Sequence, residues 1–352
     1  SKDARIRLLL SLSANLKVTD WLTLQARGNL DYSADKLRQK FYASTATALC
    51  GMNGRYIEMD YQETQMYGDV MAMVKKQLND FTLDVAIGGS INDRITNSTR
   101  IDSKNASLKY ANVFNLANIV MSSSASIDQK IDAHYQLQSV FATAQIGYKE
   151  GVFLDLTARN DWSSTLAYTK YEKKGFFYPS VGVSFLPDKW VKMPEWVSFS
   201  KLRGAYSIVG NGVPPFITYP VSYVTAGGEI LASDAAPFAE MKPEMTHSVE
   251  LGMEWKFLQH RLGLNLTYYR TDTYEQFFKL PALAGDKYAY RYVNAGDIRN
   301  QGWEITLDAT PVLTPDFTWK TSLNFSANKN KIVELHEAVS YTHLTLPTNS
   351  RV

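Results

Sequence analysis

The sequence predicts an all-β protein, an antiparallel transmembrane β-barrel, and three observations support this prediction. Hydrophobic and polar residues alternate with a period of two along most of the chain, which is typical of strands with two different faces. Most alternating segments are about 9–13 residues long, as tilted membrane strands are, whereas strands of soluble proteins more often have about five or six residues. The connections between segments tend to alternate between short and long, as on the two rims of an outer-membrane barrel.

The alternation is clearest in five segments: 22–27, 152–159, 249–256, 262–269 and 303–309. In 249–256, for example, the residues on one side are Val249, Leu251, Met253 and Trp255, and those on the other are Glu250, Gly252, Glu254 and Lys256. Helical periodicity is almost absent. We count about 14 alternating segments in the chain, each a candidate barrel strand.

The connections differ in length in a regular way. Short ones are expected at 17–20, 76–79, 148–151, 257–260 and 311–315. Long ones are expected at roughly 33–63, 91–131, 161–175, 210–246 and 271–287. Loops this long are rare inside compact soluble domains. Because a β-sandwich would not separate its loop lengths so regularly, the pattern favours a barrel with one tight rim and one elaborate rim.

The polar positions of the strands carry charges that a dry core would not accept. The charged residues that share one side of their strands are Asp155, Arg159, Glu250, Glu254, Lys256, Glu304 and Asp308. A sealed core would require a partner for each of them, whereas a wet lumen accepts them. The opposite side is rich in Leu, Val and Ile, with Trp and Tyr near strand ends, as a lipid-facing surface is. A one-sided antiparallel sheet that faces solvent is the alternative.

Composition excludes several classes of function. A formal net charge of +2 over 352 residues gives no basic footprint for nucleic acid. The single cysteine, Cys50, excludes an internal disulfide framework and a cysteine-rich metal site. The chain has no glycine-rich phosphate loop and no His-Glu-x-x-His motif, and its five histidines are scattered. We therefore expect no cofactor and no enzymatic activity. No stretch approaches the roughly 18–20 apolar residues of a membrane helix.

Six local sequences carry a resemblance to a known family. They are LTARNDWSSTL at 156–166, FYPSVGVSF at 177–185, LRGAYSIVGN at 202–211, KPEMTHSVELG at 242–252, RLGLNLTYYR at 261–270 and YVNAGDIRNQGWE at 292–304. In their order and spacing they resemble SusC/RagA-like, TonB-dependent outer-membrane transporters of bacteria. The resemblance covers most of residues 1–335.

This resemblance implies an architecture and a function. The family's barrels have about 22 strands, hold an N-terminal plug in the lumen and carry a TonB-contacting segment before the plug. They import nutrients, either glycan oligosaccharides or peptides, across the bacterial outer membrane together with a SusD-like surface lipoprotein, and the TonB complex supplies the energy. The alternatives from another class are a passive porin-like barrel and a surface adhesin. A barrel enzyme would need a nucleophile constellation that the sequence does not contain.

Both ends of the chain lead to expectations. With about 14 strands against 22, residues 1–338 are expected to form a partial barrel that lacks the plug domain, a curved sheet with unpaired edges. The start at Ser1, with neither Met nor a signal peptide, favours a truncated gene product whose TonB-contacting N-terminal region is missing. Residues 339–352 resemble translated sequencing-adapter DNA, and we expect them to be a non-native tail.

Aromatic residues in the long loops are the candidate ligand contacts. They are Tyr168, Tyr171, Trp162, Tyr219, Tyr223 and Tyr288. Aromatic faces stack on ligand rings, and they also pack loops against one another, which is the simpler explanation. For Trp162, which follows Asp161, a position at the membrane interface at the end of a strand is the simpler explanation.

Overall fold

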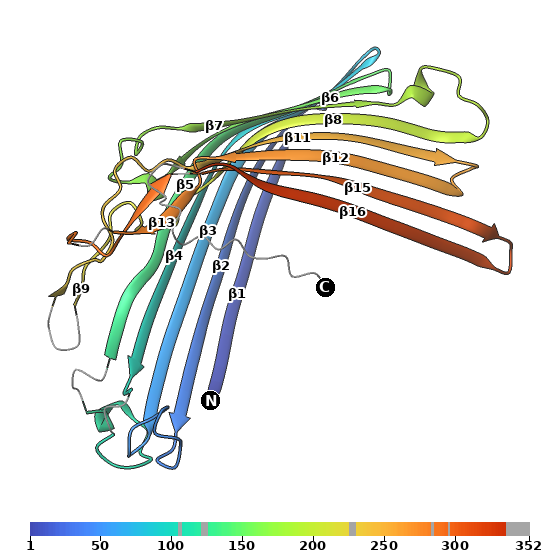
Figure 1. The fold of residues 1–352 in the computed structure, drawn as a ribbon. Coiled ribbons are helices and arrows are strands. Elements are labelled where there is room, and N and C mark those ends of the chain that lie inside the picture. The colour runs from blue at the N-terminus through green and yellow to red at the C-terminus, as the bar shows by residue number, and fades with distance from the viewer. Residues whose placement is uncertain (105–107, 121–125, 225–229, 283–284, 295, 336–352) are drawn as a thin grey trace.

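The computed structural model describes residues 1–104, 108–120, 126–224, 230–282, 285–294 and 296–335 (Figure 1). Its main element is a sheet of twelve strands within these residues. The strands are β1 (Lys2–Lys17), β2 (Leu22–Phe41), β3 (Arg55–Leu78), β4 (Phe81–Asp102), β5 (Ser126–Tyr148), β6 (Val152–Ser163), β7 (Phe176–Phe185), β8 (Val197–Asn211), β11 (Glu244–Phe257), β12 (Leu262–Tyr274), β15 (Gly296–Leu313) and β16 (Thr318–Leu335). The expected tail at 339–352 lies outside the described residues.

Two short hairpins and three 3-10 turns complete the fold. The hairpins pair β9 (Tyr223–Val224) with β10 (Ile230–Leu231) and β13 (Phe277–Pro281) with β14 (Tyr290–Asn294). The 3-10 turns are η1 (Leu116–Asn118), η2 (Ser164–Leu166) and η3 (Pro187–Lys189). Among the described residues, no helix has the length and hydropathy that crossing a membrane requires.

The sheet is an antiparallel meander that curves into an open arc. Each strand pairs with the next one in the order β1-β2-β3-β4-β5-β6-β7-β8-β11-β12-β15-β16. Figure 1 shows the bend between the arm of β1 to β5 and the arm of β8 to β16. The predicted all-β, antiparallel, incomplete barrel is therefore confirmed. We expected about 14 strands. The main sheet has twelve, and the two short hairpins add two strands each within the described residues, so the expected number lies between these two totals.

The register places the predicted charged residues on one face. Directly paired residues of antiparallel strands project to the same side of the sheet. Asp155 pairs with Gly182, Gly182 with Ala205, and Ala205 with Glu250. Glu250 pairs in turn with Tyr269, and Tyr269 with Gly302, two residues before Glu304. The seven charged positions therefore share a side, as the alternation predicts.

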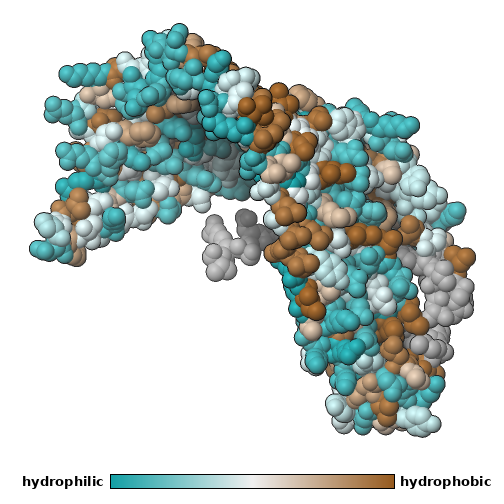
Figure 2. Space-filling view, turned by 180° about the vertical axis from the view of Figure 1, so that it is seen from behind, coloured by the Kyte–Doolittle hydropathy of each residue, from teal (hydrophilic) through white to brown (hydrophobic). Residues whose placement is uncertain are grey.

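Burial identifies this polar side as the concave one. The adjacent residues Asp69 and Val70 project to opposite faces of β3, and they are 4% and 63% exposed. Ser139 and Thr267 are also buried on the polar face, whereas Leu251 and Leu323 are exposed on the apolar face. Figure 2 shows hydrophobic side chains at the bend of the sheet and along the arm of the long strands. An exposed apolar surface of this extent is what a lipid-facing wall requires.

Tight turns form one rim of the arc. They occupy residues 18–21, 79–80, 149–151, 258–261 and 314–317, which confirms the predicted short connections. Several of their residues have the left-handed backbone that such turns require: Asn79, Lys149, Glu150, Leu258, Gln259 and His260. One connection on this rim, 186–196, is longer than the others. It contains η3 and sets the Trp190 ring 5.5 Å from that of Tyr148, measured between centroids.

Long connections form the other rim, but some are shorter than predicted. The expectation for 161–175 and 210–246 is close to the structure. It is wrong for 33–41, 55–63, 91–102 and 126–131, where β2 to β5 continue as strands. In these outer parts of the strands the convex side is polar and carries ion pairs such as Arg38–Glu58 at 2.8 Å. The hydrophobic alternation therefore stops there, although the strands remain hydrogen-bonded to one another. In 271–287, β12 continues to Tyr274 and β13 begins at Phe277.

Candidate functional site

Three long connections fold together at the long-loop rim. We call this unit the loop cap; it comprises residues 164–175, 212–224, 230–243, 275–282 and 285–294. Its buried centre is Leu166, Val213 and Met241. The half-buried aromatic residues packed on that centre are Tyr171, Phe176, Phe238, Phe277 and Tyr292. The cap therefore has a small hydrophobic core of its own.

Hydrogen bonds to backbone carbonyls join the three connections. The Thr218 hydroxyl donates to the Ala167 carbonyl at 3.0 Å, and the Phe238 amide donates to the Thr218 carbonyl at 3.1 Å. The Ala236 amide donates to the Tyr290 carbonyl at 2.9 Å, which ties the second connection to β14. Each connection is thus held by another that is distant in sequence.

Asn294 clamps two of these connections. Its amide nitrogen donates to the carbonyls of Lys242 and Glu275, at 3.1 and 2.6 Å, and its amide oxygen accepts from the Lys242 amide at 3.0 Å. The Lys242 ammonium donates to the Glu275 carboxylate at 2.5 Å. This hydrogen bond and the negative charge of Glu275 raise the pKa of Lys242, so the lysine stays charged through the neutral range.

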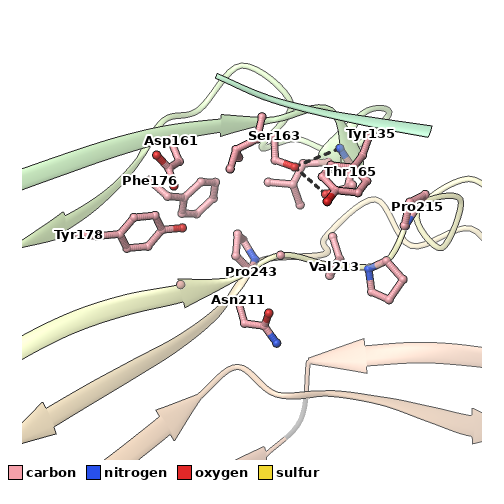
Figure 3. Close-up of a pocket in the computed structure, with 15 residues that line it drawn as sticks. Tyr135, Asp161, Ser163, Thr165, Phe176, Tyr178, Asn211, Val213, Pro215 and Pro243 are labelled. Atoms are coloured by element: carbon pink, nitrogen blue, oxygen red, sulfur yellow. Dashed lines mark hydrogen bonds between the residues drawn. The ribbon is translucent and has the colours of Figure 1, made fainter. Parts of the chain in front are cut away.

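A cavity of about 360 Å³ lies where the loop cap meets the ends of β5 to β8. Its lining includes Tyr135, Asp161, Ser163, Phe176, Tyr178, Asn211, Val213, Pro214, Pro215 and Pro243. Figure 3 shows the Tyr178 hydroxyl pointing into the space between the strand ends and the loop that carries Val213. A Cβ on Gly210 would lie 2.2 Å from that hydroxyl, so a glycine is needed there for Tyr178 to come so close.

The lining combines fixed polar groups with rigid apolar ones. The Asp161 carboxylate is held by the Arg159 Nε at 2.7 Å, and the Asn211 amide donates to Glu244 at 3.2 Å. The Ser163 hydroxyl lies 2.8 Å from that of Thr165 (Figure 3). Phe176, Val213 and three prolines supply the apolar wall. A few oriented polar groups in a mainly apolar pocket are typical of reversible ligand binding.

A second cavity of about 630 Å³ lies on the other side of Pro215, which lines both. The tip of β5 contributes Asp128, Lys130 and Asp132, and the loop cap contributes Phe216, Tyr290 and Tyr292. The Lys130 ammonium lies between the two carboxylates, at 3.3 and 3.5 Å. This cavity is the more polar of the two.

The structure separates the six predicted aromatic candidates. Tyr168 and Tyr219 lie side by side at the cap surface, with ring centroids 4.9 Å apart, and are 70% and 56% exposed. Tyr171 packs into the cap core instead. Tyr288 is half-buried in the connection between β13 and β14. The backbone of Tyr223 pairs with Leu231, and its side chain lies outside the described part of the structure.

Trp162 faces away from both cavities. It pairs with Gln138, two residues before Val140 of the convex face. Its position is compatible with the interfacial explanation, because it lies at the end of a strand on the convex, apolar side. It therefore lies on the opposite face of the sheet from Asp161, which lines the smaller cavity.

The sequence reasoning missed most of the cavity lining. Tyr135, Tyr178 and Asn211 were not candidates, and Asp161 was considered only beside Trp162. Continuing the alternation of β6 past Arg159 would have placed Asp161 on the concave side. No comparable local signal in the sequence predicts that Pro243 and Val213 line this cavity. In the described part of the chain, no group of His, Cys, Asp or Glu could hold a metal ion.

Comparison with known proteins identifies a family and shows similarity to several of its members. The model of the family "TonB dependent receptor-like, beta-barrel" matches residues 1–351. TonB-dependent receptor P3 of Formosa agariphila is 29% identical over 210 residues, which are 57% of this chain and 21% of that protein. TonB-dependent receptor SusC of Bacteroides thetaiotaomicron is 28% identical over 190 residues, 49% of this chain and 19% of that protein. The chain thus spans about a fifth of the length of these relatives.

A solved structure of the RagAB peptide transporter superposes with a TM-score of 0.82 at 19% identity. The match covers 95% of this chain and 37% of that one. At this identity the likeness shows the fold alone.

Proposed function

Because the chain belongs to the TonB-dependent receptor-like β-barrel family, we propose that it forms part of the wall of an energised importer in the bacterial outer membrane. The observation that carries the proposal is the division of the sheet into two faces. The convex face is apolar over a height suited to a bilayer, and the concave face is charged, as a water-filled lumen is. The loop cap stands at one mouth of that lumen.

The cargo that suits the site is a glycan oligosaccharide or a peptide. The smaller cavity offers carboxylate, amide and hydroxyl groups beside flat apolar surfaces, and hydroxyl-rich rings or peptide groups use both. The names of two similar proteins, SusC and the RagAB peptide transporter, agree with a cargo of this size. Of the aromatic candidates, we propose Tyr168 and Tyr219 as ligand contacts because their rings are exposed together.

Two partners complete the proposal. A SusD-like surface lipoprotein would cover the loop cap, which is the folded part of the outward mouth. The TonB complex would act through a region N-terminal to the barrel wall. The tight-turn rim would face the periplasm.

The test is uptake by cells that carry the complete transporter containing this wall. A strain without its gene, and the complemented strain, are given fluorescent oligosaccharides and peptides of graded length. We expect uptake that depends on the transporter and that stops when TonB is deleted or a protonophore is added. Uptake that persists without TonB would identify a passive porin-like barrel. Cell-surface binding without any uptake would identify an adhesin.

A further inference from the structure

Four cations gather on the convex face near the long-loop rim. We call this group the basic belt: Arg270 of β12, Arg299 of β15, and Lys329 and Lys331 of β16. Arg270 pairs with Gln301, and Gln301 with Lys329. In the next row outward, Asp272 pairs with Arg299, and Arg299 with Lys331. Paired residues project to the same side, so the four cations form two adjacent rows on one surface.

The rows of paired residues next to the basic belt indicate where the belt lies relative to the membrane. Tyr268 and Trp303, directly paired, lie two residues nearer the tight-turn rim, with ring centroids 4.8 Å apart. Below them, Leu266 pairs with Ile305, and Ile305 with Phe325, which places an apolar row there. Aromatic residues at the edge of an apolar band mark the membrane–water interface. The belt therefore stands at the height of the lipid headgroups.

The belt carries more positive than negative charge. Asp272 is its one carboxylate, and it binds both arginines through their Nε atoms, at 2.8 Å for Arg270 and 2.5 Å for Arg299. The terminal Nη groups of both arginines make no hydrogen bond within the described residues. Lys329 and Lys331 are exposed and form no salt bridge with any residue described by the structure.

On the outer parts of β2 and β3, by contrast, the cations of the convex face have partners. On β2 and β3, Arg38 is paired with Glu58 at 2.8 Å and Lys36 lies 3.9 Å from Asp60. Farther out on β15 and β16, Asp297 pairs with Glu334, so the cationic zone ends after two rows. On β12, β15 and β16 the excess positive charge thus lies in two rows immediately outside the aromatic row.

We propose that the basic belt binds the phosphate group of a lipid in the outer leaflet of the membrane. This rests on the proposed outer-membrane location. Asp272 holds the two guanidinium groups by Nε, which leaves their Nη edges oriented for bidentate contact with phosphate oxygens. The two lysines add mobile positive charge at the level where anionic headgroups lie. The acyl chains of such a lipid would lie along the apolar rows below.

The experiment uses the complete transporter in detergent micelles and measures the Kd for diphosphoryl lipid A and for the same lipid after removal of its phosphates. The test variant is Lys329→Gln/Lys331→Gln, which leaves the Asp272 cluster intact. The control is Lys149→Gln/Lys189→Gln, the same charge change at the tight-turn rim. We expect the test variant to raise the Kd for the phosphorylated lipid by about tenfold or more, and the control to leave it unchanged.

Several results would overturn the proposal. They are equal affinity for the two lipids, an unchanged Kd in the test variant, and competition by inorganic phosphate as strong as that by lipid A. Loss of a co-purifying protein from the test variant, with lipid affinity intact, would make the belt a protein interface instead. Folding of each variant is checked by heat-dependent migration on gels. Energised uptake is measured separately, so its absence in the wild-type strain would refute the proposed function without affecting the lipid measurement.

Discussion

Tyr168 and Tyr219 stack against each other across two connections of the loop cap, with ring centroids 4.9 Å apart and planes inclined by 38°. Tyr168 has a φ of 63°, a left-handed conformation that a bulky residue rarely adopts. The Thr218 hydroxyl, next to Tyr219, donates to the Ala167 carbonyl, next to Tyr168, and so holds the two rings together. An uncommon backbone conformation that supports an exposed aromatic pair is consistent with a binding role.

Replacing either tyrosine by alanine is expected to weaken ligand binding by the complete transporter. An aromatic contact contributes about 0.5–1.5 kcal/mol, so Tyr168→Ala or Tyr219→Ala should lower the affinity for the proposed oligosaccharide or peptide cargo about two- to tenfold. Isothermal titration measures this change directly. Tyr110→Ala and Trp162→Ala are the controls, because Tyr110 is an exposed tyrosine of a different loop and Trp162 faces the convex side. Equal losses of affinity in the control variants would show that Tyr168 and Tyr219 have no special role in binding.

The glycines of β2 and β4 provide a matched test of wall packing. A Cβ at Gly88 would lie 2.6 Å from the Val70 carbonyl oxygen and 2.9 Å from the Phe141 ring, whereas a Cβ at Gly28 would meet nothing within 4 Å. Gly88→Ala should therefore destabilise the wall by about 1–3 kcal/mol, and Gly28→Ala should be neutral or slightly stabilising. The midpoint temperature of thermal unfolding, measured for each variant, compares their stabilities. A Gly88→Ala protein as stable as Gly28→Ala would contradict this packing.

Removing the Asn294 clamp should loosen the loop cap and leave the sheet intact. Asn294→Ala loses three hydrogen bonds to Lys242 and Glu275. At about 1 kcal/mol for each bond, amide exchange in 236–243 and 275–282 should accelerate by about tenfold or more. Exchange in β11 and β12 serves as the internal control. Acceleration throughout the barrel would mean that the residue supports the whole fold.

The pH dependence of the clamp follows from the raised pKa of Lys242. A lysine whose pKa is raised by folding contributes its stabilisation fully below the unfolded value, and that contribution is lost as pH rises through the folded pKa. Exchange in 236–243, corrected for its intrinsic rate, should therefore stay constant from pH 7 to about 9 and increase only at more alkaline pH. Lys242→Met should abolish the alkaline increase. The effect is small, because the ion pair is partly exposed to solvent.

Charge pairing on the concave wall gives a further prediction. The Arg27 Nε contacts both carboxylate oxygens of Asp69, at 3.1 and 3.0 Å, and the Asp69 side chain is buried. Arg27→Gln leaves that carboxylate without its ionic partner, so the variant should unfold at a lower temperature than the wild type. Adding Asp69→Asn should recover part of the loss. A double variant less stable than Arg27→Gln would show that Asp69 has another partner.

The sheet could be predicted from the sequence because its signal is local. Alternation in 249–256 identifies the two faces, and the register only confirms which residues share a side. The same signal fails on β4 beyond Ile91. There Asp93 lies on the convex face and pairs with Gln136, so the alternation is lost and this part of the strand was predicted as a loop. Hydrogen bonds of the ladder continue there without a hydrophobic face.

The loop cap and its cavities could not be predicted in this way. They depend on contacts between residues far apart in the chain, such as Phe238 with Thr218 and Asn294 with Lys242. None of these residues belongs to a periodic pattern. The tyrosine-rich composition of the loops predicted aromatic contacts, but only the structure separates the exposed pair Tyr168 and Tyr219 from the half-buried Tyr171.

The central claim is that one face of this wall lies against lipid and the other against a wet lumen, and the adjacent residues Glu250 and Leu251 test it most directly. Each is replaced by cysteine in the complete transporter, with Cys50→Ser, and carries a nitroxide label in a bilayer. We predict that the label at position 251 collides mainly with oxygen, which concentrates in lipid, and that the label at position 250 collides mainly with a water-soluble nickel complex. Equal accessibility at the two positions, or the reverse assignment, would contradict the account.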